Sequence, residues 1–229
     1  MPEIGTLYIV ATPIGNLEDI TLRAIRILKE VDMILCEDTR TTKNLLNKYE
    51  IVNKTMSYHA HSTDAKESVI IQMLKDGKNL ALVSDAGTPC ISDPGVMLVA
   101  NVRKELGVEA IVVPIPGPSA LISALSASGI SSAEFVFLGF LPHKKGRETL
   151  FREIALSKRV IVFYESTHRI MKTLASLDEH APSMKVVIAR ELTKQFEQFV
   201  EGTPKEVLDY FTNNNDKQRG EFVVIVAPK

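Results

Sequence analysis

The sequence lacks several features that mark specialised classes of protein. It has two cysteines, no tryptophan and a formal net charge of −1 over 229 residues. Cys36 and Cys90 form no metal-binding or redox spacing, so we expect them to be small apolar side chains in a reducing, cytoplasmic setting. No hydrophobic run approaches the ~20 residues of a transmembrane helix, and no basic leader opens the chain, so we expect no membrane association. The balanced charge argues against strong nonspecific nucleic-acid binding but permits a local basic surface.

The common nucleotide-binding and hydrolase motifs are also absent. There is no Gly-x-x-x-x-Gly-Lys-Ser/Thr loop, which argues against a P-loop NTPase. Thr12-Pro13-Ile14-Gly15 stands where a dinucleotide-binding fold would carry its glycine-rich turn. No Gly-x-Ser-x-Gly elbow appears. His59 and His61 share one face of an extended segment, but no third ligand accompanies them, so we expect no metal site.

What the sequence does contain is a regular alternation of short apolar runs and amphipathic stretches. Alternation of this kind predicts a parallel sheet covered by helices. After Gly129 the pattern changes to one that favours a mixed sheet. The sequence therefore predicts an α/β protein of two lobes, with a parallel α/β lobe over residues 1–117 and an α+β lobe over residues 118–229. The expected strands lie near residues 7–11, 33–36, 54–58, 79–83 and 109–113, and then near 135–142, 159–164, 185–189, 196–202 and 221–227.

Unusual loops follow every expected strand of the first lobe. The densest is 84–95, Ser-Asp-Ala-Gly-Thr-Pro-Cys-Ile-Ser-Asp-Pro-Gly, in which Gly87 can adopt a positive φ. Asp93 is expected to cap a following helix, with Pro94 at its first position. Ligands of parallel sheets bind at the carboxyl ends of the strands, so these loops predict a binding site. The other loops are 12–16, 37–40, 59–62 and 114–119.

These motifs resemble the tetrapyrrole methylase superfamily of methyltransferases. Within it they are similar to the branch that methylates the ribose 2′-oxygen of a cytidine in 16S ribosomal RNA. The loop 84–95 is highly specific for this branch, some members of which carry a C-terminal extension. The resemblance spans nearly the whole chain and is carried by residues 7–20, 36–40, 84–95, 116–120, 137–142, 163–169 and 189–194.

The resemblance implies that S-adenosyl-L-methionine binds between two lobes, and that the enzyme is a homodimer acting on small-subunit rRNA in an assembled 30S particle. Each implied position has packing in a core as its alternative. A site of backbone amides and apolar walls suits a donor with a sulfonium, an ammonium, a carboxylate and an adenine. The implied donor-binding residues are Ile14, Gly87, Thr88, Pro89, Ile91, Ser119, Ala120, Tyr164, Ala189 and Arg190.

A general base near the ribose hydroxyl would assist the transfer. Glu37 and Glu165 follow expected strands and are our candidates for this catalytic role. The alternative is that these carboxylates pair with Arg40 or Arg169 to fix loops.

Two local groups of basic residues are candidates for RNA phosphate binding, and solvated surface is the alternative for both. One comprises Arg40, Lys43 and His59, and the other Lys144, Lys145 and Arg147. Two other functions stay open: the same scaffold acting on a tetrapyrrole or a protein, and a non-catalytic RNA-binding module of the ribosome.

Overall fold

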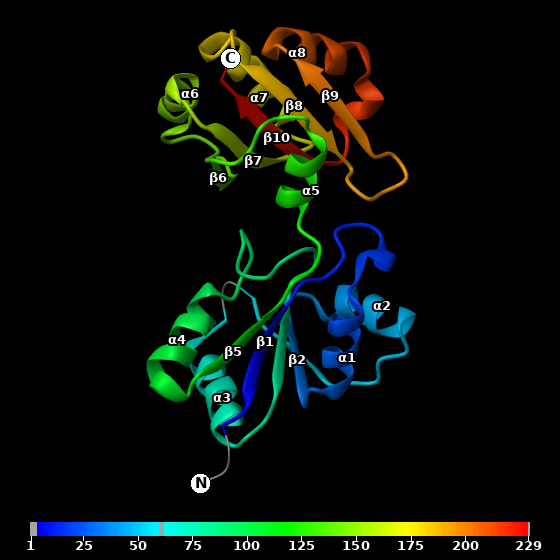
Figure 1. Ribbon diagram of the computed structural model, residues 1–229, viewed down its shortest axis with the longest axis vertical. Coiled ribbons are helices and arrows are strands. Elements are labelled where there is room, and N and C mark those ends of the chain that lie inside the picture. Colours follow the sequence, from blue (N-terminus) through cyan, green and yellow to red (C-terminus); the bar gives the residue numbers. More distant parts are fainter. Residues whose placement is uncertain (1–3, 60–61, 229) are drawn as a thin grey trace. The chain divides into compact units, whose positions relative to one another are not determined.

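The computed structural model describes residues 4–59 and 62–228. The chain consists of two compact units, Met1–Ser119 and Ala120–Lys229. The sequence predicts this division two residues earlier, after residue 117. Figure 1 labels the elements of both units.

The N-terminal unit is built on a five-stranded parallel sheet with the order β3-β2-β4-β1-β5. The parallel sheet predicted from the alternating pattern is confirmed. Because β1 lies between β4 and β5, the chain leaves β1 towards one edge and later crosses to the other. The loops after β1 and β4 therefore flank a topological switch point. The strands are β1 (Thr6–Val10), β2 (Met33–Cys36), β3 (Thr55–Ser57), β4 (Leu80–Val83) and β5 (Ile111–Ile115).

Helices cover both faces of this sheet (Figure 1). Successive strand residues point to opposite faces. Ala81 and Val83 accordingly pack against α1 (Leu22–Glu30) and α2 (Thr39–Lys48). Leu80 and Leu82 pack against α3 (Asp64–Lys75) and α4 (Val96–Leu106). Burial on both faces explains why these strands lack polar alternation. Two short 3₁₀ helices complete the unit, η1 (Leu17–Asp19) and η2 (Gly107–Glu109).

The C-terminal unit contains a mixed sheet with the order β6-β7-β10-β8-β9. Only the β6–β7 pair is parallel, and the other three pairs are antiparallel. The predicted mixed sheet is thus confirmed. Its strands are β6 (Phe135–Phe140), β7 (Val160–Ser166), β8 (Lys185–Arg190), β9 (Gln198–Gly202) and β10 (Glu221–Ala227).

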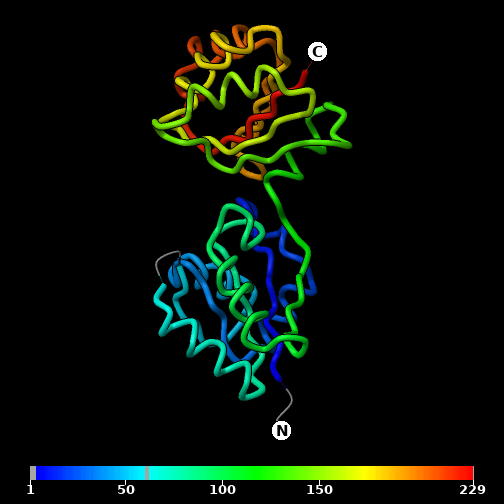
Figure 2. The backbone as a smooth tube through the Cα atoms, turned by 90° about the vertical axis from the view of Figure 1, so that its left-hand side faces the viewer, coloured from blue at the N-terminus to red at the C-terminus, as the bar shows by residue number. Residues whose placement is uncertain are grey.

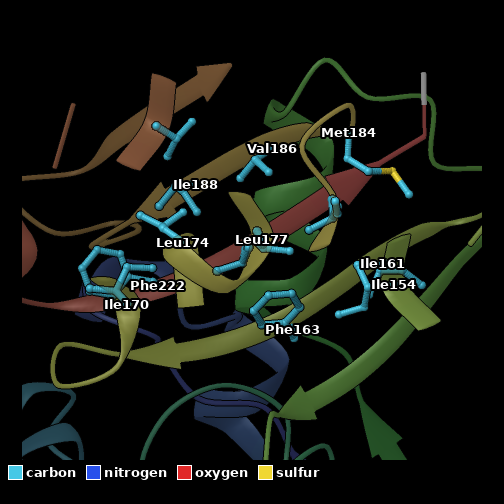
Figure 3. Close-up of a cluster of buried hydrophobic side chains, with 14 of the residues drawn as sticks. Ile154, Ile161, Phe163, Ile170, Leu174, Leu177, Met184, Val186, Ile188 and Phe222 are labelled. Atoms are coloured by element: carbon cyan, nitrogen blue, oxygen red, sulfur yellow. The ribbon is translucent and has the colours of Figure 1, made fainter. Parts of the chain in front are cut away.

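Three helices cover one face of the mixed sheet, α6 (Arg147–Leu156), α7 (Ile170–His180) and α8 (Pro204–Asn213). Figure 3 shows Phe163 of β7 and Leu177 of α7 within this core. The helix α5 (Ala120–Ala127) contacts β10. The short 3₁₀ helix η3 (Asn215–Gln218) precedes β10 in sequence. Within the described part of the chain, no helix is long and apolar enough to cross a bilayer.

Candidate functional site

The loops after β1 and β4 are joined by a backbone bridge. Thr12 N–H donates to the Gly87 carbonyl (2.8 Å), and Gly87 N–H donates to the Thr12 carbonyl (2.9 Å). The Thr12 hydroxyl also donates to the Ser84 carbonyl at 3.0 Å. Gly87 has φ +83°, and a Cβ there would lie 3.4 Å from Ile14 Cγ2. Both loops lie at the same end of the N-terminal unit, beyond the carboxyl ends of β1 and β4 (Figure 2).

The loop after β5 joins the same assembly. The Thr88 hydroxyl donates to the Pro118 carbonyl at 3.2 Å, which places Ser119 beside the β4 loop. Three loops far apart in sequence thus meet at the switch point, and they bring the predicted residues Ile14, Gly87 and Thr88 together. Pro89 is buried, whereas the apolar Ile91 side chain is 45% exposed.

The 84–95 loop is strained in two places. Cys90 has φ 70° and Ser92 has φ 64°, conformations that non-glycine residues rarely adopt. Such strain persists only where the surroundings determine the backbone, and it gathers at functional sites. The prediction that Asp93 caps a helix is wrong. Helix α4 begins at Val96 behind Gly95, which has φ 125° and supplies no side-chain cap.

Asp93 belongs instead to a group of carboxylates at the same edge of the sheet. The pKa of Asp93 is raised to about 6, mainly by burial and also by the charges of Glu37 and Asp85, while a hydrogen bond from Ser84 opposes the rise. Burial, followed by the charge of Asp85, also raises the pKa of Glu37. Asp38 N–H donates to Asp85 Oδ1 at 3.2 Å, which ties the β2 loop to the β4 loop. Nothing in the sequence pattern indicates this role for Asp93, because Asp-Pro-Gly before a helical pattern is typical of a helix cap.

No group of three or more His, Cys, Asp and Glu side chains that could hold a metal ion occurs among residues 4–59 and 62–228. His59 is exposed, and His61 lies outside the described residues. Ser62 accepts a hydrogen bond from the His59 backbone N–H at 2.9 Å.

Tyr164 and Ala189 lie in one row across the sheet of the C-terminal unit. Val223 of β10 is paired with Tyr164 on one side and with Ala189 on the other, so all three side chains share a face. Arg190 lies on the opposite face, and its guanidinium donates to the carbonyls of Arg219 (2.7 Å) and Phe196 (3.2 Å). The Arg190 side chain therefore fixes two loops.

Glu165 is fully buried and engaged on both oxygens. Its Oε1 accepts from Arg169 Nε and from Ser166 N–H, each at 2.8 Å. Its Oε2 accepts from the Thr173 hydroxyl at 2.6 Å. Arg147 Nη2 donates to the same hydroxyl at 2.7 Å. A carboxylate without exposed surface cannot reach a substrate hydroxyl, so the structure favours the alternative of pairing with Arg169 over a general base.

The family model for tetrapyrrole (corrin/porphyrin) methylases matches residues 6–208. The chain belongs to this family. Two curated relatives carry the name ribosomal RNA small subunit methyltransferase I. The protein from Bacillus subtilis is 47% identical over 98% of this chain and 75% of its own length. That from Thermotoga maritima is 46% identical over 99% of this chain and its entire length.

Several solved structures share the fold at low sequence identity. A cobalt precorrin-4 methyltransferase has a TM-score of 0.67 at 16% identity, over 97% of this chain and 94% of its own. A diphthine synthase has a TM-score of 0.72 at 11% identity, over 97% and 90%. The uroporphyrin-III C-methyltransferase of Thermus thermophilus, crystallised with S-adenosylhomocysteine, has a TM-score of 0.65 at 16% identity, over 97% of both chains.

Arg147 is one of the residues predicted to contact RNA, but the structure buries its side chain. It is 7% exposed, lies over the Phe151 ring and donates to the Pro142 carbonyl at 3.3 Å. Burial also lowers its pKa. Lys144 and Lys145 are exposed in the preceding loop, as are Lys43 and His59 in the N-terminal unit. Arg40 is exposed too, but its guanidinium pairs with Asp38 at 2.9 Å.

Proposed function

We propose that the chain uses S-adenosyl-L-methionine to methylate the ribose 2′-oxygen of a cytidine in 16S rRNA of the small ribosomal subunit. One observation carries the proposal: the 46–47% identity to the two relatives extends over nearly the entire chain. Every loop of the candidate site is therefore inside the matched region.

The residues at the switch point fit the donor. Backbone of the 84–95 loop, the side chain of Ile14 and the exposed side chain of Ile91 offer polar and apolar contacts within one unit. The carboxylates of Glu37, Asp85 and Asp93 supply negative charge at the same edge, which complements the positive sulfonium and ammonium groups. The further contacts proposed for the donor are Ser119, Ala120, Tyr164, Ala189 and the backbone of Arg190.

S-Adenosylmethionine supplies a methyl group made electrophilic by a positively charged sulfur. The C–S bond breaks as the C–O bond to the ribose forms, and the 2′-hydroxyl proton must pass to a base. Glu37 and Asp93 support this role, since both are half-buried carboxylates with raised pKa values. Positioning of the two reactants contributes as well, by roughly 7–11 kcal/mol in favourable cases.

The exposed Lys144 and Lys145 support binding of RNA phosphates. No carboxylate in the described ranges forms an ion pair with either lysine, whereas nearby Arg152 and Arg159 are paired with Glu148 and Glu134. An assembled 30S particle as substrate, a homodimeric enzyme and a cytoplasmic location complete the proposal. A ribosomal acceptor is consistent with all three.

The test is calorimetric titration with S-adenosylmethionine, followed by transfer of a tritiated methyl group to 30S subunits that lack the modification. Saturable binding and label in the ribose of one cytidine are expected. Donor binding with no label in rRNA would redirect the assignment to a tetrapyrrole or protein acceptor. Absence of donor binding would favour a non-catalytic RNA-binding module.

A further inference from the structure

A bulge in the edge strand β6 gathers three aromatic rings on one face of the mixed sheet. Phe137 pairs with Val162, and Phe140 pairs with Tyr164, so three steps along β6 match two along β7. The extra residue falls where Gly139 has φ 62°, a conformation typical of such bulges. Without the bulge, Phe137 and Phe140 would point to opposite faces.

The three rings form one contact group. The Tyr164 ring lies 5.0 Å from that of Phe137 and 5.5 Å from that of Phe140, with interplanar angles of 69° and 60°. Phe140 is nevertheless 56% exposed. Its ring is held by a neighbour while much of its surface stays open, which is an arrangement suited to stacking.

A basic loop follows this aromatic group directly. His143, Lys144 and Lys145 are all exposed. Two arginines hold the backbone where the loop begins. Arg169 Nη1 donates to the Leu141 carbonyl (2.7 Å), and Arg147 Nη1 donates to the Pro142 carbonyl (3.3 Å). Exposed positive charge thus lies within five residues of an exposed aromatic face.

We propose that Phe140, supported by Tyr164 and Phe137, is a stacking platform for an unpaired base of the RNA substrate, with the loop 143–145 binding the adjoining phosphates. Unstacked bases on aromatic side chains beside a positive surface are the usual mode of single-stranded RNA recognition. This inference rests on the proposed function and adds the residue that orients the nucleotide. The adenine of the methyl donor offers the same chemistry, so the experiment must separate the two sources.

The first experiment compares Phe140→Leu, which keeps an apolar contact with Tyr164, with the aromatic replacement Phe140→Tyr. Phe196→Leu is the matched control, since Phe196 is 65% exposed in the loop between β8 and β9. We expect Phe140→Leu to raise KM for 30S subunits by at least about fivefold. The donor Kd should stay unchanged, and Phe140→Tyr and Phe196→Leu should behave as the wild type.

A second readout uses the absence of tryptophan from the chain. Phe140→Trp creates a unique fluorophore, which a stacked base should quench when a short oligocytidylate is added. The same RNA should leave the fluorescence of the Phe196→Trp variant unchanged. Quenching by S-adenosylmethionine alone, with a weakened donor Kd in Phe140→Leu, would assign the platform to adenine and overturn the proposal. An unchanged KM for Phe140→Leu in a wild-type enzyme that does methylate 30S subunits would also overturn it. A wild-type enzyme that transfers no methyl group would instead fail the proposed function.

Discussion

Thr12 and Gly87 are 75 residues apart, yet they exchange two backbone hydrogen bonds of 2.8 and 2.9 Å. The bridge is antiparallel, whereas β1 and β4 pair in parallel, so it is a separate link between the two loops beyond the ends of both strands. A ligand held by either loop therefore also depends on the conformation of the other.

Replacing Gly87 with alanine should weaken donor binding. The left-handed φ of +83° costs a residue with a Cβ about 1–2 kcal/mol, whereas the added methyl group would make only an ordinary contact with Ile14. We expect roughly a tenfold rise in the donor Kd by calorimetry, if that cost falls on the binding conformation. Gly107→Ala is the matched control, because Gly107 has φ +57° with open space around it at the far end of α4. Equal effects of both variants on donor affinity would contradict a specific role for the β4 loop.

Asp93→Asn should stabilise the fold at neutral pH. Asp93 has a pKa of about 6 in the folded chain against 3.8 for an ordinary aspartate, so the folded state binds more protons than the unfolded state between these pH values. Stability therefore falls as pH rises from about 4 to 6. Because the side chain is only half-buried, the expected gain is on the order of 1 kcal/mol at pH 7.5, vanishing near pH 4. Urea denaturation across this range tests it, with the exposed Glu105→Gln as the control.

The same variant tests proton transfer. If Asp93 accepts the 2′-hydroxyl proton, the wild-type rate should decline as pH falls below about 6, where this carboxylate becomes protonated. Asp93→Asn should lower kcat at pH 7.5 by roughly 100-fold and abolish that limb of the profile. A pH profile that keeps its acidic limb in both Asp93→Asn and Glu37→Gln would exclude both carboxylates as the base.

Thr173→Val should destabilise the C-terminal unit. The Thr173 hydroxyl is fully buried, donates to Glu165 and accepts from Arg147, so its removal leaves two charged groups short of a partner. We expect a loss of about 2–3 kcal/mol in the free energy of unfolding. Thr173→Ser keeps the hydroxyl and should cost about 1 kcal/mol. Chemical denaturation measures both, and similar losses would show that methyl packing rather than the network matters.

Charge reversal at Lys144 and Lys145 should weaken RNA binding in a salt-dependent manner. Each lost phosphate contact lowers the slope of log K against log salt by about 0.7 for single-stranded RNA, so the double variant should flatten it by about 1.4 or more. Arg103→Glu with Lys104→Glu changes the same charge on exposed residues of α4 and should leave the slope intact. An unchanged slope in the loop variant would remove these lysines from the interface.

Periodicity and loop chemistry were sufficient to predict both sheets, because buried strands and capped helices leave local signals. The alternation of strands and helices before residue 128 indicates a parallel sheet whatever the order of its strands. How deeply a side chain is buried, and which way it points, depend on contacts with residues far away in the sequence. Arg147 continues a run of exposed basic residues, yet the first turn of α6 points it inward to Thr173. Asp93 resembles a helix cap, but the strained loop turns it towards Glu37 and Asp85. The bulge at Gly139 depends on pairing with β7 and has no counterpart in the strand pattern.

The strand order of the N-terminal sheet also determines when β1 can pair with its native neighbours during synthesis on the ribosome. The immediate partners of β1 are β4 and β5, so the two strands made first, β1 and β2, are not native neighbours of each other. About 70 residues separate the end of β1 from the start of β4. At 5–20 residues per second, that interval lasts roughly 4–14 s. During it β1 lacks both of its native neighbours, so we expect the nascent N-terminal unit to expose apolar backbone edges that favour chaperone binding until β4 has emerged.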